Sequence, residues 1–304
     1  MENMVDRTPE SETAVRKAVT AHPRLFEENR YVYPVLSRRS RGLSIGVNLN
    51  PDKVCNFDCI YCQVDRDVPP VVRKVDPDRL LEELRGLLGE ASSGAIWDRE
   101  SFRDIPDELK RVNDIAFSGD GEPTTYPGFL DVIRATGRIK QEFGLDQVKT
   151  ILITNCTRFH RPEVRQALEA MHQDNGEIWA KLDAGTQEYY DLVERSRVPF
   201  DQVLANLRDA AARWPLVIQS LFMRIREAPP PPEEVAAYCD VLKGILDGGG
   251  QLKLVQAYTV ARRPAEPWVA SLSDSEMDAL AQTVREHLPG VPVEVFYGAR
   301  PDAA

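Results

Sequence analysis

The chain has 304 residues, of which 42% are hydrophobic and 28% charged, a composition that suits a globular protein and excludes a wholly disordered, collagen-like or coiled-coil chain. Its 48 acidic and 38 basic residues give a formal net charge of −10, so a broad cationic surface for nucleic acid is not expected. No apolar run reaches the roughly 18 residues of a membrane span, and we predict a cytoplasmic protein without a membrane partner.

Residues 1–30 are charged, lack the apolar core of a signal peptide, and predict an N-terminal extension with a helix at Ser11–Thr20. Short β-branched runs then alternate with helical stretches. The expected strands are Leu43–Leu49, Val112–Ser118, Val148–Thr154, Ile178–Asp183, Leu216–Phe222 and Leu252–Tyr258. The expected helices are Pro77–Leu88, Tyr126–Phe143, Pro162–Met171, Phe200–Arg213 and Pro232–Leu246. A polar insertion is expected at residues 92–111. Strands joined by crossover helices imply an α/β fold with a parallel sheet.

Three cysteines, Cys55, Cys59 and Cys62, follow the first expected strand within eight residues. The odd total of five cysteines argues against a disulfide framework and favours metal ligation by the clustered thiolates. A structural zinc site needs four ligands, and no histidine between His22 and His160 supplies the fourth. Three thiolates suit a cubic [4Fe-4S] cluster with one open iron. A zinc site and unrelated buried cysteines are the alternatives.

The sequence CNFDCIYC of residues 55–62 resembles the C-x3-C-x2-C signature of the radical S-adenosylmethionine (SAM) enzymes, with Tyr61 as the aromatic residue before the last cysteine. The resemblance implies one [4Fe-4S] cluster on the three cysteines, whose open iron chelates SAM. It also implies reductive cleavage of SAM to a 5′-deoxyadenosyl radical that abstracts hydrogen from a substrate. An external electron donor of the flavodoxin or ferredoxin type is expected. The implied fold is a partial (β/α)6 barrel, which the six expected strands fit.

Glycines and a carboxylate follow the second expected strand in the sequence SGDGEPT. Active sites of parallel barrels lie at the carboxyl ends of the strands, and glycine lets a backbone approach a ligand closely. This stretch resembles the family's Gly-Gly-Glu motif and implies a SAM site at Gly119, Asp120, Gly121 and Glu122. Asp120 departs from the motif, which more often has two adjacent glycines. A strand-to-helix turn with Glu122 in its first turn is the alternative.

The third and fourth expected strands end in further polar residues. Asn155 belongs to a Thr-Asn pair that in the family usually precedes glycine, which Cys156 replaces here. The resemblance implies that Asn155 contacts the bound nucleoside. Alternation along strand four turns Trp179, Lys181 and Asp183 into the barrel. We expect Lys181 and Asp183 near SAM or substrate, and an interior ion pair between them is the alternative.

Strands five and six add Gln219, Gln256 and Tyr258 as expected residues of the barrel lumen. A polar core with internally satisfied hydrogen bonds explains these residues equally well. Cys156 and Cys239 remain outside the cysteine cluster and are expected to be buried structural thiols.

The expected core barrel spans residues 31–260, between the N-terminal helical extension of residues 1–30 and a C-terminal extension of residues 261–304. Ser273 and Glu276 form the capping-box pattern that starts a helix. The C-terminal extension is therefore predicted to contain a helix and a strand, Asp274–His287 and Val291–Tyr297.

Further stretches narrow the resemblance to the radical SAM group around wyosine-type tRNA synthetases and their uncharacterised relatives: CNFDCIYCQVDR, FSGDGEPT, ITNCT, KLDAGT and VQAYTVAR. The resemblance implies a tRNA guanosine as one substrate. The wyosine enzymes carry a second cluster, however, and two remaining cysteines are too few to ligate it. The acidic balance also disfavours binding of a phosphate backbone. We expect a small-molecule substrate, with tRNA modification and a non-catalytic iron–sulfur or zinc module as alternatives.

Overall fold

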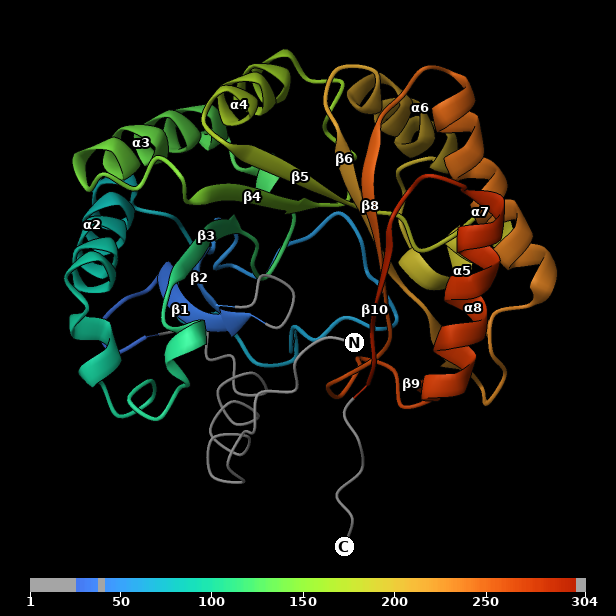
Figure 1. Cartoon of the computed structure of the whole chain (residues 1–304), viewed down its shortest axis with the longest axis horizontal. Coiled ribbons are helices and arrows are strands. Elements are labelled where there is room, and N and C mark those ends of the chain that lie inside the picture. Colours follow the sequence, from blue (N-terminus) through green and yellow to red (C-terminus); the bar gives the residue numbers. More distant parts are fainter. Residues whose placement is uncertain (1–25, 38–41, 299–304) are drawn as a thin grey trace, which may run out of the picture.

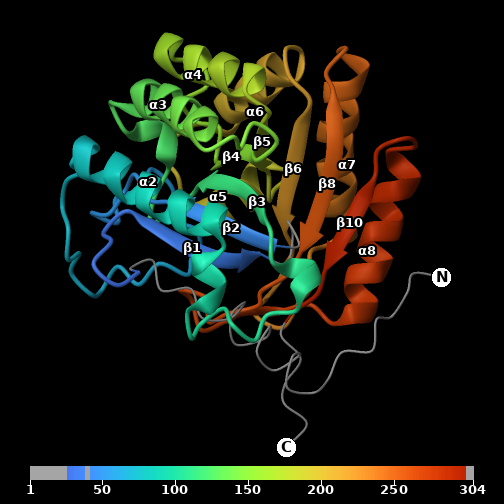
Figure 2. The same cartoon turned by 60° about the vertical axis from the view of Figure 1, so that its left-hand side comes forward.

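A curled parallel sheet with helices on its outer side forms the centre of the molecule (Figures 1 and 2). The computed structural model describes residues 26–37 and 42–298, so the helix expected at Ser11–Thr20 lies outside the described residues. The strand order of the main sheet is β1-β2-β3-β4-β5-β6-β8-β10. The sheet forms an open half-barrel, which confirms the predicted α/β partial barrel.

Seven strands of this sheet are parallel to one another. They are β2 (Gly42–Val47), β3 (Val112–Phe117), β4 (Lys149–Thr154), β5 (Gly176–Lys181), β6 (Leu216–Leu221), β8 (Leu252–Tyr258) and β10 (Val293–Phe296). The first six coincide with the six strands predicted for the barrel, with ends that differ by no more than about two residues. Strand β1 (Val32–Ser37) pairs antiparallel with β2 at the edge of the sheet and was not predicted.

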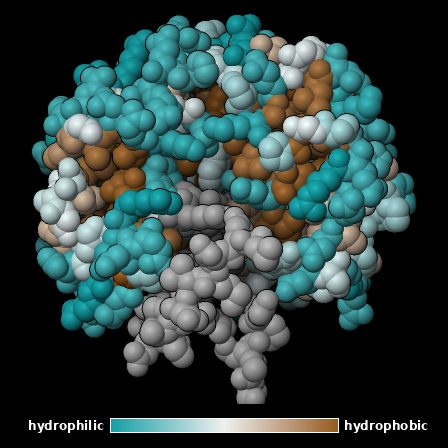
Figure 3. All heavy atoms as spheres, in the orientation of Figure 1, coloured by the Kyte–Doolittle hydropathy of each residue, from teal (hydrophilic) through white to brown (hydrophobic). Residues whose placement is uncertain are grey.

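Amphipathic helices cover the outer face of the sheet, because each has a stripe of apolar residues to bury. They are α2 (Pro77–Ser93), α3 (Phe129–Glu142), α4 (Pro162–Gln173), α6 (Phe200–Ala211), α7 (Pro232–Asp247) and α8 (Asp274–His287). Helix α8 begins with the predicted capping box of Ser273 and Glu276. In the space-filling view, hydrophilic side chains form the outer rim and hydrophobic ones lie inside it (Figure 3).

The two faces of the sheet bury different clusters of side chains. On β5 and just after it, Ile178, Ala180 and Leu182 belong to the large core shared with the helices. Trp179 instead packs with Ile151, Val217 and their neighbours in a separate lumen cluster. The predicted alternation of strand four is therefore present, and these apolar side chains fill one layer of the lumen.

Several elements differ from the prediction. Helix α5 (Gln187–Glu194) follows β5, and a small antiparallel sheet joins β7 (Met223–Ile225) to β9 (Val269–Ser271). Strand β10, which we expected in a C-terminal extension, pairs with β8 and continues the main sheet. The division of the chain at residue 260 stays a prediction. The described residues also form three short 3-10 helices: η1 (Ala95–Asp98), η2 (Asp107–Leu109) and η3 (Pro123–Thr125).

The polar insertion predicted at residues 92–111 contains η1 and η2 and is partly apolar in its packing. Ile96, Phe102 and Ile105 in this segment are buried in the main core. The segment therefore belongs to the folded barrel. Among the described helices, none is both long and apolar enough to cross a membrane.

Candidate active site

Polar residues gather at the carboxyl edge of the sheet, around the segment of residues 55–62 that we call the cysteine loop. The Nδ2 atom of Asn155, just after β4, donates to Oδ1 of Asn56 at 2.8 Å. The hydroxyl of Tyr61 donates to the carboxylate of Asp183, just after β5. These contacts join the cysteine loop to the ends of β4 and β5 across 99 and 122 residues of sequence, as expected for the active edge of a parallel barrel.

Helix α5 holds the cysteine loop through its last backbone carbonyls. The amide of Asp58 donates to the carbonyl of Glu194 at 2.9 Å, and the amide of Ile60 donates to the carbonyl of Val193 at 3.0 Å. The carbonyls in the last turn of a helix lack partners within the helix, so they are free to accept these bonds. The loop is thus fixed by its backbone, independently of the cysteine side chains.

Aromatic rings of α5 and α6 pack beside the same loop. The ring of Phe57 packs edge-to-face on Tyr190 of α5, with ring centroids 5.7 Å apart. Tyr190 in turn stacks on Phe200 of α6 at 4.7 Å. Each such aromatic pair stabilises the fold by about 0.5–1.5 kcal/mol in addition to the free energy of burying its surface.

The chain after β8 also contacts the cysteine loop. The amide of Glu266 donates to the carbonyl of Ile60 at 3.1 Å, and the Glu266 carboxylate pairs with Arg195 at 2.6 Å. The guanidinium groups of Arg195 and Arg226 lie over the Trp268 ring, 5.8 and 5.5 Å from its centroid. We call residues 262–268 the strap.

The three clustered thiols lie in different electrostatic surroundings. Cys59 donates to Oε2 of Glu194 at 2.7 Å, and burial together with Glu194 raises the pKa of Cys59 well above its usual value. Burial raises the pKa of Cys55 to about 11. Cys62 accepts a hydrogen bond from Nη1 of Arg66 at 3.4 Å. Burial and the adjacent Asp183 carboxylate raise the pKa of Glu194 itself well above its usual range.

The donor set fits a cluster better than a single ion. In the part of the chain that the structure describes, no three His, Cys, Asp or Glu side chains converge closely enough to hold one metal ion. A cubic cluster binds its thiolates at separate iron corners, so its ligands need not converge on one point. Three half-buried thiols on one loop suit this arrangement, whereas a closed zinc site requires four ligands.

Lys181 and Asp183 lie together in the lumen. The Lys181 ammonium is 2.9 Å from Oδ1 of Asp183 and donates to the Tyr258 hydroxyl at 2.5 Å. It also lies over the Tyr61 and Tyr258 rings, at 5.1 and 4.7 Å. Burial lowers the pKa of Lys181, but Asp183 and Tyr258 raise it more, so the group stays an ammonium. The interior ion pair that was the alternative reading is present here.

The Asp183 carboxylate is a junction of the lumen network. Besides Lys181 and Tyr61, it accepts from the backbone amide of Leu221 at 2.7 Å. Deeper in the lumen, Nε2 of Gln219 donates to Oε1 of Gln256 at 3.1 Å. These polar side chains satisfy one another, as the alternative of a satisfied polar core requires.

The Glu122 carboxylate is buried and links two loops of the site. It accepts from Thr124, which places it as the cap of the 3-10 helix η3, and from the Thr154 hydroxyl at 2.6 Å. It also accepts from the amide of Asn155 at 2.8 Å. Glu122 therefore fixes the backbone beside Asn155, which in turn contacts the cysteine loop.

Gly119 and Gly121 are required by a close approach within the protein. A Cβ on Gly119 would lie 2.3 Å from Oδ1 of Asn48, and one on Gly121 would lie 2.1 Å from the carbonyl of Val54. Nδ2 of Asn48 also donates to Asp120 at 2.7 Å. The glycines let the loop after β3 lie directly against the chain that leads into the cysteines.

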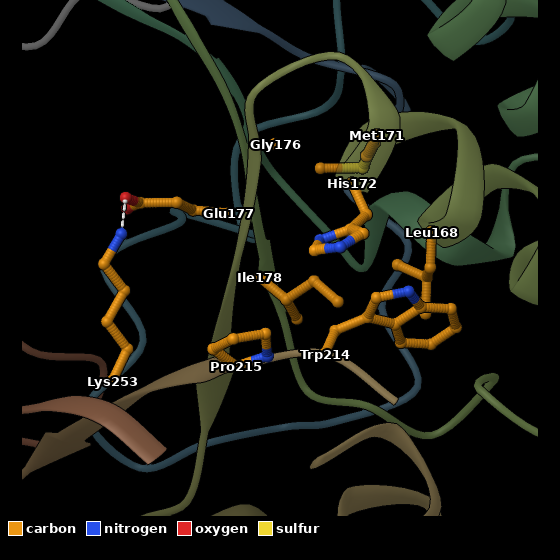
Figure 4. Close-up of a pocket in the computed structure, with 9 residues that line it drawn as sticks. All are labelled: Leu168, Met171, His172, Gly176, Glu177, Ile178, Trp214, Pro215 and Lys253. Atoms are coloured by element: carbon orange, nitrogen blue, oxygen red, sulfur yellow. Dashed lines mark hydrogen bonds and ion pairs between the residues drawn. The ribbon is translucent and has the colours of Figure 1, made fainter. Parts of the chain in front are cut away.

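Two cavities lie at opposite ends of the barrel. A cavity of about 310 Å³ adjoins the cysteine loop, and its lining includes Lys53, Gln63, Asp120 and Arg262. A cavity of about 130 Å³ lies at the amino ends of β5 and β6, with Trp214 and Ile178 among its lining residues (Figure 4). The second cavity lies away from the cysteines, and the ion pair of Glu177 with Lys253 at its edge links two strands.

The sequence did not reveal two residues that contact the cysteines, Glu194 and Arg66. Glu194 lies far from the cysteines in sequence and ends a short helix that was not predicted. Its only local signal is Thr186, which caps α5 by accepting from the amide of Tyr189 at 3.2 Å. Arg66 follows Cys62 closely, but no spacing rule assigns a role to that position.

The family model described as Radical SAM superfamily matches residues 49–226 of the chain. A UPF0026 protein of Helicobacter pylori is 27% identical over 256 residues, which cover 80% of this chain and 70% of that protein. UPF0026 protein MJ1312 of Methanocaldococcus jannaschii is 27% identical over 135 residues, or 43% of this chain and 35% of that protein.

Two solved structures share the fold. A structure of TYW1 with a lysine-pyruvate adduct bound has a TM-score of 0.54 at 16% identity and covers 90% of this chain and 80% of its own. A crystal structure of Streptococcus suis SuiB bound to S-adenosylmethionine has a TM-score of 0.57 at 11% identity, with 85% and 52% covered. At these identities the likeness concerns the barrel alone.

Proposed function

The chain belongs to the radical SAM superfamily, and from that premise we propose that it is an enzyme in which Cys55, Cys59 and Cys62 hold one [4Fe-4S] cluster. The observation that supports this most strongly is the cysteine loop itself, where three half-buried thiols lie within eight residues of sequence, on a loop that contacts the ends of β4 and β5. When bound, the cluster supplies the electron that cleaves SAM into methionine and a 5′-deoxyadenosyl radical. An external flavodoxin- or ferredoxin-type protein is the proposed electron donor.

We assign the SAM site to residues that surround the loop. Tyr61, Asn155, Lys181 and Asp183 are proposed to contact SAM, together with the backbone of Gly119–Glu122. The Lys181–Asp183 ion pair adjoins the cysteine loop, because the Asp183 carboxylate also accepts from the hydroxyl of Tyr61. The hydrogen bonds of Glu122 and Asn155 keep this part of the site rigid before any ligand arrives.

We propose a compact substrate. The cavity of about 310 Å³ beside the cysteine loop has the size of a small metabolite, and both charged and apolar residues line it. The net charge of −10 gives little general attraction for a polyanion such as tRNA. The cytoplasmic location stays a prediction.

The test is anaerobic reconstitution with iron and sulfide, followed by reduction with dithionite in the presence of SAM. We expect visible absorbance of an iron–sulfur cluster and formation of 5′-deoxyadenosine. Cys59→Ala should lose both, whereas the matched control Cys239→Ala, which changes a thiol buried in α7, should keep them. A loaded protein that binds SAM but gives no 5′-deoxyadenosine with any reductant would contradict the catalytic proposal.

Calorimetry with SAM separates the enzyme from a non-catalytic metal module. The enzyme should bind SAM once its cluster is in place. A protein that takes up iron or zinc without affinity for SAM would instead be a binding module.

A further inference from the structure

Arg66 contacts the cysteine loop at two residues and the chain just before it at a third. Its Nη1 donates to Sγ of Cys62 at 3.4 Å and lies 3.6 Å from Oδ1 of Asp58. Its Nε donates to the carbonyl of Lys53 at 3.2 Å. The Arg66 side chain is 30% exposed, so its charge is only partly screened by water.

The segment that carries Arg66 is itself fixed in place. The Lys53 ammonium donates to the carbonyls of Asp65 and Val68, at 2.6 and 2.7 Å, and so ties the chain after the cysteines to the chain before them. Oδ1 of Asp65 also accepts from the amide of Asp67 at 3.0 Å. These hydrogen bonds therefore hold the segment that carries Arg66 beside Cys62.

The charges around the three thiols are unequal. On the buried side, Cys59 faces the Glu194 carboxyl, which adjoins Asp183. On the outer side, Cys62 accepts from the positively charged guanidinium of Arg66. The reduction potential of an iron–sulfur cluster depends on its net charge, on hydrogen bonds to its sulfurs and on exposure.

We propose that Arg66 is a positioning residue that orients Cys62 and raises the reduction potential of the cluster. This inference rests on the proposed function, because it takes Cys62 as a cluster ligand. One electron passes from the external donor to the cluster, and no covalent bond forms or breaks in that step. The added negative charge is stabilised by the N–H donor and the positive charge of Arg66, so reduction becomes more favourable.

The test is a redox titration of the reconstituted protein, followed by visible absorbance and electron paramagnetic resonance. At a fixed potential near the midpoint, Arg66→Gln should lower the ratio of reduced to oxidised cluster by about threefold to tenfold, and tenfold corresponds to about 59 mV for one electron. Arg66→Lys keeps the charge and should recover part of the change. Arg73→Ala, which removes an exposed arginine from the same stretch, should leave the ratio unchanged.

The salt dependence of the reduction potential gives a second measurement, which a purely structural role of Arg66 would not affect. The difference between the native protein and Arg66→Gln should shrink as salt concentration rises, because salt screens a partly exposed charge. If Arg66→Gln fails to load iron, Arg66→Lys supplies the comparison of potentials. Equal potentials in all three proteins would overturn the inference, whereas a native protein that takes up no cluster would overturn the proposed function instead.

Discussion

Cys156 has a backbone conformation that cysteine rarely adopts. Its φ is +63°, in the left-handed region, and its side chain is fully buried beside the loop after β4. For a residue with a Cβ this conformation costs about 1–2 kcal/mol, and glycine avoids the cost. The turn at this position therefore favours glycine, the residue that the family resemblance led us to expect after Asn155. Cys156 adopts the same turn at an energetic cost.

Substitutions at Cys156 should separate backbone strain from packing. Cys156→Ala loses the buried sulfur but keeps the strain, whereas Cys156→Gly removes both. We expect Cys156→Gly to match or exceed Cys156→Ala in free energy of unfolding, measured by urea denaturation. At Ala180, which is buried in β5 and lacks a positive φ, the change to glycine should cost about 1 kcal/mol. A Cys156→Gly protein clearly less stable than Cys156→Ala would show that the strain is unimportant.

Cys239 should make stability depend on alkaline pH. Burial raises the pKa of Cys239 from 9.0 to about 11. Between these values the unfolded thiol loses its proton while the folded thiol keeps it, so stability falls as pH rises by up to about 1.4 kcal/mol per unit. The stability difference between the native protein and Cys239→Ala should therefore narrow by about 2 kcal/mol between pH 8 and pH 10.5 in urea denaturation. A difference that stays constant with pH would refute this account.

At the scale of elements, the cysteine loop depends on α5 and on the aromatic rings that pack beside it. Tyr190 contacts Phe57, stacks on Phe200, and donates from its hydroxyl to the carbonyl of Val198 at 2.8 Å. Loss of the Tyr190 ring removes the contact of α5 with both the cysteine loop and α6. The cysteine loop and α5 should therefore open together.

Tyr190→Ala should loosen the cysteine loop selectively. We expect exchange of the Asp58 and Ile60 amides to accelerate at least about tenfold, which corresponds to about 1.4 kcal/mol of local opening. Tyr190→Phe keeps the ring and should show much less change. Hydrogen exchange with mass spectrometry measures both, and β4 serves as an internal reference. Equal acceleration throughout the barrel would point to global destabilisation instead.

The elements that could be predicted share a strong local signal. Helices such as α3 and α7 repeat apolar residues over several turns, and β4 is a β-branched run bounded by polar residues. Helix α5 has only eight residues and gives too short a pattern. Strand β1 contains Pro34, which normally argues against a strand and is tolerated here at a sheet edge.

The candidate site shows the same division. The positions of the three cysteines and of the strand-end residues near one edge of the sheet could be predicted, because motif spacing and strand alternation are local properties of the sequence, while their roles stay a prediction. Glu194 could not, because its contact with Cys59 joins residues 135 positions apart and depends on how α5 packs. The sequence predicted that Gly119 lets the backbone approach a ligand. In the structure, the close neighbour of Gly119 is Asn48 of the same chain.

For the whole molecule, strands and helices build most of the hydrophobic core, and Cys55 and Cys59 of the cysteine loop pack against it as partly buried side chains. The main core lies between the sheet and the helices, and the loop is held by backbone bonds to α5 and by the ring of Phe57. Binding of a cluster should therefore add to a barrel that is already folded.

Removal of the cluster should change the protein locally. After chelation we expect unchanged far-ultraviolet circular dichroism and faster hydrogen exchange confined to residues 53–72 and α5. Reloading with iron and sulfide should reverse the change. Loss of helical signal or a cooperative collapse of the barrel on chelation would contradict this expectation.

The strap and α5 have a consequence for the order of events during synthesis. The partners of the cysteine loop, Glu194 and Glu266, are made long after the cysteines themselves. At roughly 5–20 residues per second, the ribosome reaches Glu266 on the order of 10–40 s after Cys62. During that interval the nascent loop lacks the contacts that α5 and the strap supply in the complete fold.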